Sequence, residues 1–425
     1  MNPDCGFLIG NYQLLFEIDV GGYASVWRGI HIKTRVEVAV KIIEKSTMTE
    51  ESLIRLQREA LIHRQLENPF IASLFDVFEN NEFYFIIIEL AEKGNFLDYI
   101  NSMGKLPEEK TKKYFAQLVY AIEYLHTKQN IAHRDIKCEN ILLDKYGVLK
   151  LIDFGFSHEF TLENKLMTTP CGSPPYAAPE IIKGHMYTAA TDIWGIGIFL
   201  YAMLVGRLPF EGPTTTALMQ RILYSDPYFD KDMSVVSCDL ISKLLMKNVN
   251  DRITIKEIKS HPWFSLKDYE LIVSITNNYN EKHNDETIKQ LMKIGYNVDN
   301  LPELLKNNEI TDLTAAFRML YRSETSKFWG VFNPPNTNEM KYLSLPPSCN
   351  STHLRVSCNR EDPESKHKKQ RVIIFSPKIK ATTPHREKKL LHPVPASPVN
   401  LIRQQLNEPR RKSKPIFVRP TLYNS

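Results

Sequence analysis

His133-Arg134-Asp135-Ile136-Lys137-Cys138-Glu139-Asn140 is followed, thirteen residues after Asn140, by Asp153-Phe154-Gly155. The two stretches supply a lysine, an amide and separate acidic side chains in a fixed order. Phosphoryl transfer needs one carboxylate near the attacking hydroxyl and separate oxygen ligands for the cations that neutralise the phosphate charge. The two stretches contain the residue types that this chemistry uses.

The same stretches resemble the catalytic loop and the metal-binding loop of protein kinases, and the resemblance extends over residues 12–264. It implies an α+β fold of two lobes, a β-rich N-lobe and a helical C-lobe. It also implies that Asp135 orients the substrate hydroxyl and that Lys137 adds positive charge at the transferred phosphoryl group. Asn140 and Asp153 would hold the Mg²⁺ ions that bridge the ATP phosphates. In this family a lysine at the position of Lys137 accompanies Ser/Thr specificity.

The hydrophobic pattern agrees with two lobes. Short strand-like runs occupy residues 12–43, and residues 83–88 form a continuous apolar run typical of a buried strand. Residues 49–66 place apolar side chains at helical spacing among charges, which predicts an amphipathic helix. The uncharged stretch 193–206 is shorter than the roughly 18 residues of a membrane span, so it predicts a buried helix.

Val38-Ala39-Val40-Lys41 resembles the third strand of the kinase N-lobe, whose lysine contacts the α- and β-phosphates. That lysine pairs with a glutamate on the following helix. Glu59 is the expected partner, because it lies on the helical stripe of residues 49–66. The resemblance therefore makes Lys41 and Glu59 catalytic residues, and an ordinary surface pair is the alternative.

The nucleotide loop departs from the family pattern Gly-x-Gly-x-x-Gly-x-Val, because residues 19–26 keep only the central glycine, Gly21. Gly22 restores some backbone freedom, whereas Asp19 brings a carboxylate toward the nucleotide. Apolar residues are expected to enclose the adenine, and the hinge at residues 88–91 is expected to read its edge. The resemblance assigns cofactor binding to Gly21, Gly22, Val26, Ala39, Lys41, Glu89, Ala91 and Leu142.

Residues 167–180 resemble the activation segment of AMP-activated and related calmodulin-dependent-like kinases. Thr169 falls at their activating phosphorylation site, although Thr168 is an adjacent alternative. A phosphate on Thr169 carries nearly two negative charges and would bind Arg134, which directly precedes the catalytic aspartate. We therefore expect Thr169 and Arg134 to be regulatory.

Two structural roles follow from the same resemblance. Glu180 and Arg252 are expected to form a buried ion pair, and Asp192 is expected to brace the backbone of the catalytic loop. Neither role requires contact with a substrate.

Outside residues 12–264 the sequence predicts a leader at 1–11, a polar, Asn-rich linker at 265–285 and a helical segment at 286–322. This segment resembles a ubiquitin-associated domain through Met292-Lys293-Ile294-Gly295-Tyr296. A plain helical extension is the alternative. In related kinases such a module docks on the catalytic domain. Residues 323–425 are rich in Pro, Ser, Lys and Arg and are expected to be disordered. The apolar residues expected to fill the core of the helical segment are Leu301, Leu304, Leu305, Ala316, Phe317 and Leu320.

The charge of this 425-residue chain is uneven. Residues 351–425 hold 17 Lys and Arg against 5 Asp and Glu, a net charge of +12. Since the whole chain has a net charge of +5, residues 1–350 have a net charge of −7. The catalytic region therefore has no nucleic-acid footprint. The basic tail is a candidate for binding an acidic partner or an anionic membrane surface, or it is merely solvated. The six cysteines have no Cys-x-x-Cys spacing, which favours the cytoplasm, with nuclear access possible.

The sequence therefore predicts an ATP- and Mg²⁺-dependent serine/threonine protein kinase, similar to the AMP-activated and microtubule-affinity-regulating branches. Protein substrates and an upstream activating kinase are the partners that this resemblance implies. The alternative is a pseudokinase scaffold that binds partners without phosphoryl transfer. Asp19 and the missing glycines are its only support.

Overall fold

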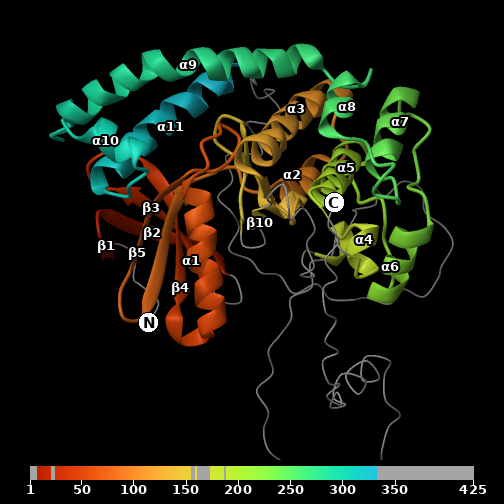
Figure 1. Cartoon of the computed structure of the whole chain (residues 1–425), viewed down its shortest axis with the longest axis horizontal. Coiled ribbons are helices and arrows are strands. Elements are labelled where there is room, and N and C mark those ends of the chain that lie inside the picture. The colour runs from red at the N-terminus through yellow and green to blue at the C-terminus, as the bar shows by residue number, and fades with distance from the viewer. Residues whose placement is uncertain (1–6, 21–23, 155–157, 160–172, 186–187, 333–425) are drawn as a thin grey trace, which may run out of the picture. The chain divides into compact units, whose positions relative to one another are not determined.

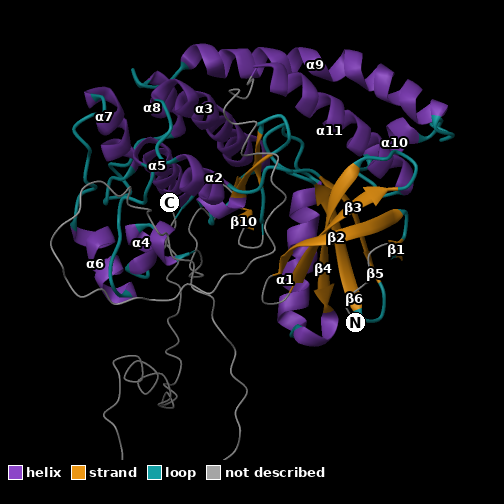
Figure 2. Ribbon diagram, turned by 180° about the vertical axis from the view of Figure 1, so that it is seen from behind, coloured by secondary structure: helices purple, strands orange, loops and turns teal. Residues whose placement is uncertain are grey.

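The computed structural model describes residues 7–20, 24–154, 158–159, 173–185 and 188–332. The predicted α+β architecture is confirmed, because a β-sheet lobe is followed by a helical lobe (Figures 1 and 2). Gly21, Gly22 and Thr169 lie outside the described residues, as does the chain from residue 333 onward.

The N-lobe is built on a six-stranded antiparallel sheet with the strand order β1-β2-β3-β4-β6-β5. The strands are β1 (Leu8–Ile9), β2 (Tyr12–Val20), β3 (Ala24–His31), β4 (Glu37–Glu44), β5 (Leu74–Glu79) and β6 (Phe83–Glu89). The expected leader at 1–11 is partly wrong, because Ile9 pairs with Tyr12 across a turn at Gly10 and is buried. Gly10 has a φ of +55°, which suits glycine, so the chain can turn back here and add β1 to the sheet.

Helix α1 (Glu50–Arg64) lies against this sheet. The side chain of Thr49 caps it by accepting a hydrogen bond from the backbone N–H of Ser52. Leu56 and Ala60 pack into one apolar cluster with Ile43 of β4. This packing directs the neighbouring Glu59 toward β4, where Lys41 lies.

The C-lobe is mainly helical, and its described residues include four short strands. Its elements are α2 (Phe96–Met103), α3 (Glu108–Tyr124), β7 (Ile131–Ala132), β8 (Ile141–Leu143), β9 (Leu149–Leu151), β10 (His158–Glu159), α4 (Pro179–Ile182), α5 (Ala190–Val205), α6 (Thr215–Tyr224), α7 (Val235–Leu244) and α8 (Ile255–Ser260). The predicted buried helix at 193–206 is confirmed as α5, which forms the centre of the lobe. A Cβ on Gly195 would lie 2.7 Å from the Cβ of Ile136, so glycine lets α5 approach the catalytic loop.

Three helices follow: α9 (Leu266–Lys293), α10 (Leu301–Lys306) and α11 (Asp312–Phe332). The expected linker at 265–285 is helical, because Ser265 caps α9 and the apolar face of Tyr269, Ile272 and Ile275 joins the C-lobe core. The expected boundary at residue 322 is also wrong, since α11 continues for ten more residues. Figures 1 and 2 show α9 running from the helical lobe to α10, with α11 returning beneath it.

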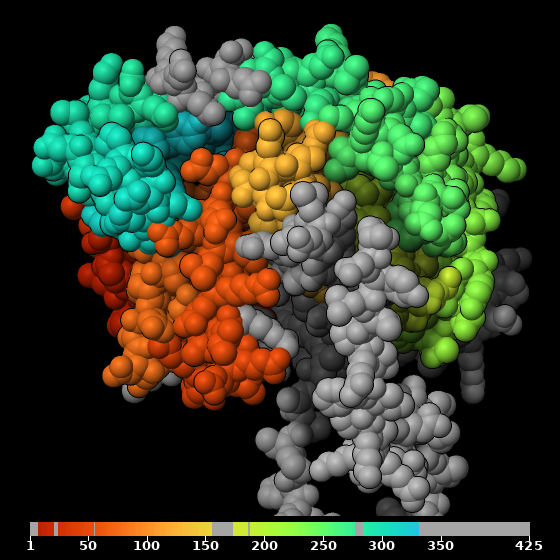
Figure 3. Space-filling view, viewed as in Figure 1, coloured from red at the N-terminus to blue at the C-terminus, as the bar shows by residue number. Residues whose placement is uncertain are grey.

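Helix α11 covers the N-lobe sheet on the face away from α1. Ala315 and Met319 are fully buried in one cluster with Tyr12, Leu14 and Val40 of the sheet. Figure 3 shows α10 and α11 lying directly on the N-lobe. Within the part of the chain that the structure describes, no helix is both long enough and apolar enough to cross a membrane.

The predicted core of residues 286–322 is largely confirmed. Leu301, Ala316 and Phe317 form a small apolar cluster, and Leu305 and Leu320 pack against it. Leu304 is only half-buried and is not a member of the cluster. The resemblance to a ubiquitin-associated domain stays a prediction.

Candidate active site

Asp192 at the start of α5 holds the catalytic loop in place. Its carboxylate accepts hydrogen bonds from the backbone N–H groups of His133 (2.9 Å) and Arg134 (2.7 Å) and from Nε2 of His126 (2.7 Å). Burial alone would raise the pKa of Asp192, but His126 and these neighbours hold it below its ordinary value. The predicted bracing role of Asp192 is therefore confirmed. Arg134 has a φ of +73°, so the loop needs this support to keep a non-glycine residue in that conformation.

Asp135 is 3% exposed and lies between a lysine and an amide. Nζ of Lys137 donates to its Oδ2 at 2.5 Å, and Nδ2 of Asn140 donates to the same atom at 2.9 Å. The other carboxylate oxygen, Oδ1, has no hydrogen-bond partner among the described residues. One oxygen is thus fixed by the loop, and the other remains able to accept a proton from a hydroxyl group.

Asn140 ends a short 3-10 turn, Cys138–Asn140, that leads into β8. Its Nδ2 donates to the carbonyl oxygen and to the carboxylate of Asp135, both at 2.9 Å. Only the amide nitrogen can donate to these acceptors, which leaves the amide oxygen Oδ1 for another contact.

Asp153 has a φ of +68°, and the following Phe154 is 1% exposed. The ring of Phe154 contacts the imidazole rings of His63 on α1 and His133 on the catalytic loop, with centroids 4.8 and 5.0 Å apart. The aromatic contacts fix the backbone on the C-terminal side of Asp153. They also tie α1 to the catalytic loop, a role for His63 that the helical pattern did not reveal.

Lys41 and Glu59 form the predicted ion pair, with Nζ and Oε1 3.7 Å apart. Burial lowers the pKa of Lys41, but the carboxylates of Glu59 and Asp153 outweigh it and hold the pKa above its ordinary value. Burial raises the pKa of Glu59, Lys41 opposes this effect and Asp153 adds to it. The structure therefore brings Lys41, Glu59 and Asp153 into one electrostatic group.

The residues expected around adenine come from both lobes. Val26 on β3 pairs with Lys41 on β4, and Ala39 pairs with Ile88 of β6. Leu142 on β8 forms a bridge with Asn95, just after the hinge. Ala91 is 9% exposed in the hinge. The loop glycines Gly21 and Gly22 lie outside the described residues, so their predicted contacts stay predictions.

The activation segment is described only in part, and Thr169 lies outside the described residues. Beyond it, Glu180 and Arg252 form the predicted buried ion pair, with two parallel hydrogen bonds of 2.7 and 2.8 Å. Arg252 also donates to the carbonyl oxygens of Met246 and Ala190. This bidentate pair fixes the end of the activation segment on the C-lobe.

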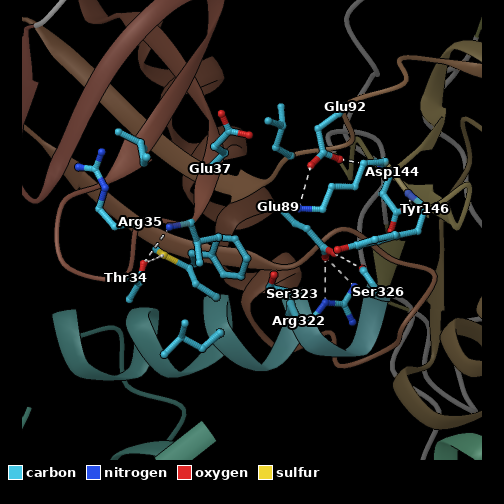
Figure 4. A pocket seen from close by; sticks show the side chains of 17 residues that line it. Thr34, Arg35, Glu37, Glu89, Glu92, Asp144, Tyr146, Arg322, Ser323 and Ser326 are labelled. Carbon is cyan, nitrogen blue, oxygen red and sulfur yellow. Dashed lines mark hydrogen bonds and ion pairs between the residues drawn. The ribbon is translucent and has the colours of Figure 1, made fainter. Parts of the chain in front are cut away.

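Glu89 turns its side chain to the back of the hinge, where Figure 4 shows it beside Arg322 of α11. Nε and Nη2 of Arg322 donate to one oxygen of Glu89 at 2.8 and 2.6 Å, and Nζ of Lys150 lies 2.6 Å from the other. Arg322 further donates to the carbonyl oxygens of Asn68, Pro69 and Ile71. Burial alone would raise the pKa of Glu89, yet Arg322 and Lys150 lower it to about 2. The sequence offered no signal for this cluster.

His63 provides a test of the link between α1 and Phe154. Burial lowers the pKa of His63 to about 4, although its Nε2 donates to the carbonyl oxygen of Ala72. In the unfolded chain the imidazole of His63 binds a proton near pH 6.5, whereas in the folded chain it does so only near pH 4. Its contribution to the free energy of unfolding is therefore complete above pH 6.5 and is lost as the pH falls toward 4. Between pH 7 and pH 5 we expect the free energy of unfolding of the wild type to fall by about 2 kcal/mol more than that of His63→Gln.

Urea unfolding at the two pH values measures this difference. His185→Gln, which replaces an exposed histidine, is the control and should follow the wild type. Equal pH dependence in the wild type and His63→Gln would show that His63 is not buried as a neutral imidazole.

Comparisons with known proteins agree with this geometry. The family model described as the protein kinase domain matches residues 12–264. The chain is 34% identical over 378 residues to serine/threonine-protein kinase SIK2 of Gallus gallus, which covers 84% of this chain and 47% of that protein. It is 32% identical over 342 residues to SNF1-related protein kinase catalytic subunit alpha KIN12 of Arabidopsis thaliana, which covers 79% of this chain and 68% of that protein. The chain thus spans about half the length of the first relative and about two thirds of the second.

Proposed function

The chain belongs to the protein kinase family, and from this premise we propose that it transfers the terminal phosphoryl group of ATP to serine and threonine hydroxyls of protein substrates. The observation that carries the proposal is the hydrogen bonding of the two carboxylate oxygens of Asp135. One of its oxygens is held by Lys137 and Asn140, and the other has no partner among the described residues. This is the arrangement that a residue orienting a substrate hydroxyl requires.

In this mechanism the residues of the chain position the hydroxyl and balance charge. Asp135 Oδ1 accepts the hydrogen bond from the attacking hydroxyl, while Lys137 compensates the negative charge that gathers on the transferred group. Lys41 contacts the phosphates and is held by Glu59. Asp192 keeps the loop backbone from moving during the reaction.

Mg²⁺ is the metal that we propose for this site, and the donor set fits it. Asn140 directs its amide nitrogen to Asp135, so its Oδ1 is available, and Asp153 supplies a carboxylate nearby. Hard cations prefer such oxygen ligands. When bound, the metal would neutralise phosphate charge and orient the nucleotide.

The scaffold alternative is weakened by the position of Asp19. Its side chain is exposed to solvent, and its Oδ1 accepts a hydrogen bond from the backbone N–H of Val20 at 2.8 Å. An exposed carboxylate is screened by water and salt, so its repulsion of a nucleotide is well under about 1 kcal/mol. The intact set of Lys41, Glu59, Asp135 and Asp153 favours the enzyme.

We also propose that phosphorylation of Thr169 by an upstream kinase activates the enzyme through Arg134. A phosphate there would add charge-assisted hydrogen bonds that order the activation segment. The basic tail is a further proposed contact for an acidic partner or an anionic membrane surface, and the scattered cysteines favour a cytoplasmic or nuclear location. These proposals rest on the sequence.

A transfer assay tests the proposal and its switch together. The full-length chain, with and without prior phosphorylation by an upstream kinase, is incubated with labelled ATP, Mg²⁺ and a mixture of Ser/Thr peptides. We expect transfer to the peptides that rises by roughly 10- to 150-fold on phosphorylation, as one charge-assisted hydrogen bond is worth about 1.5–3 kcal/mol. Thr169→Ala should abolish the rise, whereas Thr168→Ala should keep it. Stoichiometric ATP binding without transfer in either state would instead support the scaffold.

A further inference from the structure

Apart from the cavity behind the hinge that is drawn in Figure 4, a second cavity lies where the end of α1 meets the C-terminal helices, away from the candidate active site. It has a volume of about 380 Å³. Its floor is the end of α1 and the following residues 64–74, and α9, α10 and α11 contribute the other walls. Six apolar or aromatic side chains line much of it: Leu66, Leu74, Leu305, Phe317, Tyr321 and Trp329.

The cavity behind the hinge provides a useful contrast. It has a volume of about 470 Å³, and Figure 4 shows the carboxylate of Glu89 turned toward Arg322. Glu89 is paired with Arg322 and Lys150, and Glu92 is paired with Lys145. Because these side chains already form ion pairs with one another, they do not need a charged ligand. We therefore assign this cavity a structural role.

The second cavity is not balanced in this way. Arg64 of α1 and Arg318 of α11 both line it, and Glu67 is the acidic side chain among its described lining residues. Arg322 also lines it but is already bound to Glu89. Burial lowers the pKa of Arg318, Glu67 opposes this effect, and the like charge of Arg64 lowers it further. Two guanidinium groups, those of Arg64 and Arg318, therefore line one partly buried space with a single carboxylate, that of Glu67, among the described lining residues.

Asn308 links the side chain of Arg318 to the backbone at Arg64. Asn308 accepts a hydrogen bond from Nη2 of Arg318 and donates to the backbone carbonyl oxygen of Arg64 at 3.2 Å. Nε of Arg64 is buried and has no hydrogen-bond partner among the described residues. The hydrogen bonds of the described residues therefore leave the guanidinium group of Arg64 without a full set of partners.

We propose that this cavity binds a small amphipathic anion, an apolar body carrying one carboxylate or phosphate group, with the anionic group between Arg64 and Arg318. Guanidinium groups bind both kinds of anion through paired hydrogen bonds, and an enclosed apolar wall is the usual surround of such a group in a ligand pocket. Because the ligand would touch α1 and α11 at once, its binding also stabilises their contact.

The test uses two compounds that differ in charge alone, 4-phenylbutyrate and its neutral amide, together with phenyl phosphate and inorganic phosphate. Binding to the full-length chain is measured by calorimetry and by the shift in melting temperature. We expect 4-phenylbutyrate or phenyl phosphate to bind and to raise the melting temperature, whereas the amide and inorganic phosphate bind at least tenfold more weakly.

Arg318→Gln and Arg64→Gln should each weaken the anion by tenfold or more. Arg58→Gln, which removes an exposed arginine from the same helix as Arg64, is the matched control and should bind like the wild type. If a glutamine variant melts well below the control without ligand, Arg318→Lys and Arg64→Lys keep the charge and should retain weaker binding. Equal binding of the acid and its amide, unchanged affinity in both arginine variants, or no binding to the wild type would overturn the proposal. None of these readouts depends on phosphoryl transfer.

Discussion

Replacing Asp135 by asparagine is expected to lower kcat by about 10²- to 10⁴-fold, the usual contribution of a positioned general base. The substitution keeps the shape of the side chain but removes the charge of the oxygen that has no partner among the described residues. It also removes the ion pair with Lys137. The KM for ATP should change little, because Asp135 is proposed to contact the hydroxyl and not the nucleotide. Steady-state kinetics with a phosphorylated peptide product as readout measures both constants.

Asp232→Asn is the matched control, since this carboxylate is exposed on the C-lobe surface. It should keep wild-type kcat. The melting temperatures of the two variants show whether any loss reflects the site or the fold. Wild-type turnover in Asp135→Asn would remove Asp135 from the mechanism.

Replacing Arg322 by methionine is expected to cost about 3–5 kcal/mol, the usual penalty for breaking a buried ion pair from one side. The change removes both hydrogen bonds to Glu89 and leaves the carbonyl oxygens of Asn68, Pro69 and Ile71 without this donor. Because the lost contacts all join α11 to the N-lobe, at the hinge residue Glu89 and at residues 68–71, the first effect should be release of α11. Amide hydrogen exchange of residues 312–332 and urea unfolding measure the two consequences.

Two companion variants sharpen this result. Arg322→Lys keeps the charge but loses the planar fork, so its loss of stability should lie between those of the wild type and Arg322→Met. Lys306→Met removes an exposed cation from α10 and should have an effect within about 0.5 kcal/mol. If exchange in α11 is unchanged in Arg322→Met, Arg322 does not anchor the helix.

The residues that the family resemblance placed on short motifs were predictable. Lys41 and Glu59 pair as expected, Glu180 and Arg252 pair as expected, and Asp192 holds the catalytic loop. Each of these residues has a fixed position in a short sequence motif, so its partner could be named from the sequence. Their catalytic and regulatory roles stay predictions, since the geometry alone does not test turnover.

The contacts of the C-terminal helices were not predictable from the sequence. Arg322 lies 233 positions after Glu89, and an arginine on a helix normally indicates a solvated surface. The polar composition of residues 265–285 likewise suggested a linker, yet the helix that contains them is anchored by apolar contacts at its start and end. In both cases tertiary packing decides what local composition leaves open.

The position of α11 has a consequence for how the chain is made. The N-lobe sheet is complete when residue 89 has been synthesised, but Ala315 and Met319, which cover one of its faces, come more than two hundred residues later. At about 5–20 residues per second, roughly 10–50 s pass before α11 leaves the ribosome. During that time the nascent sheet exposes an apolar face and keeps Glu89 without its arginine. A newly made N-lobe therefore stays incompletely packed until α11 has been translated.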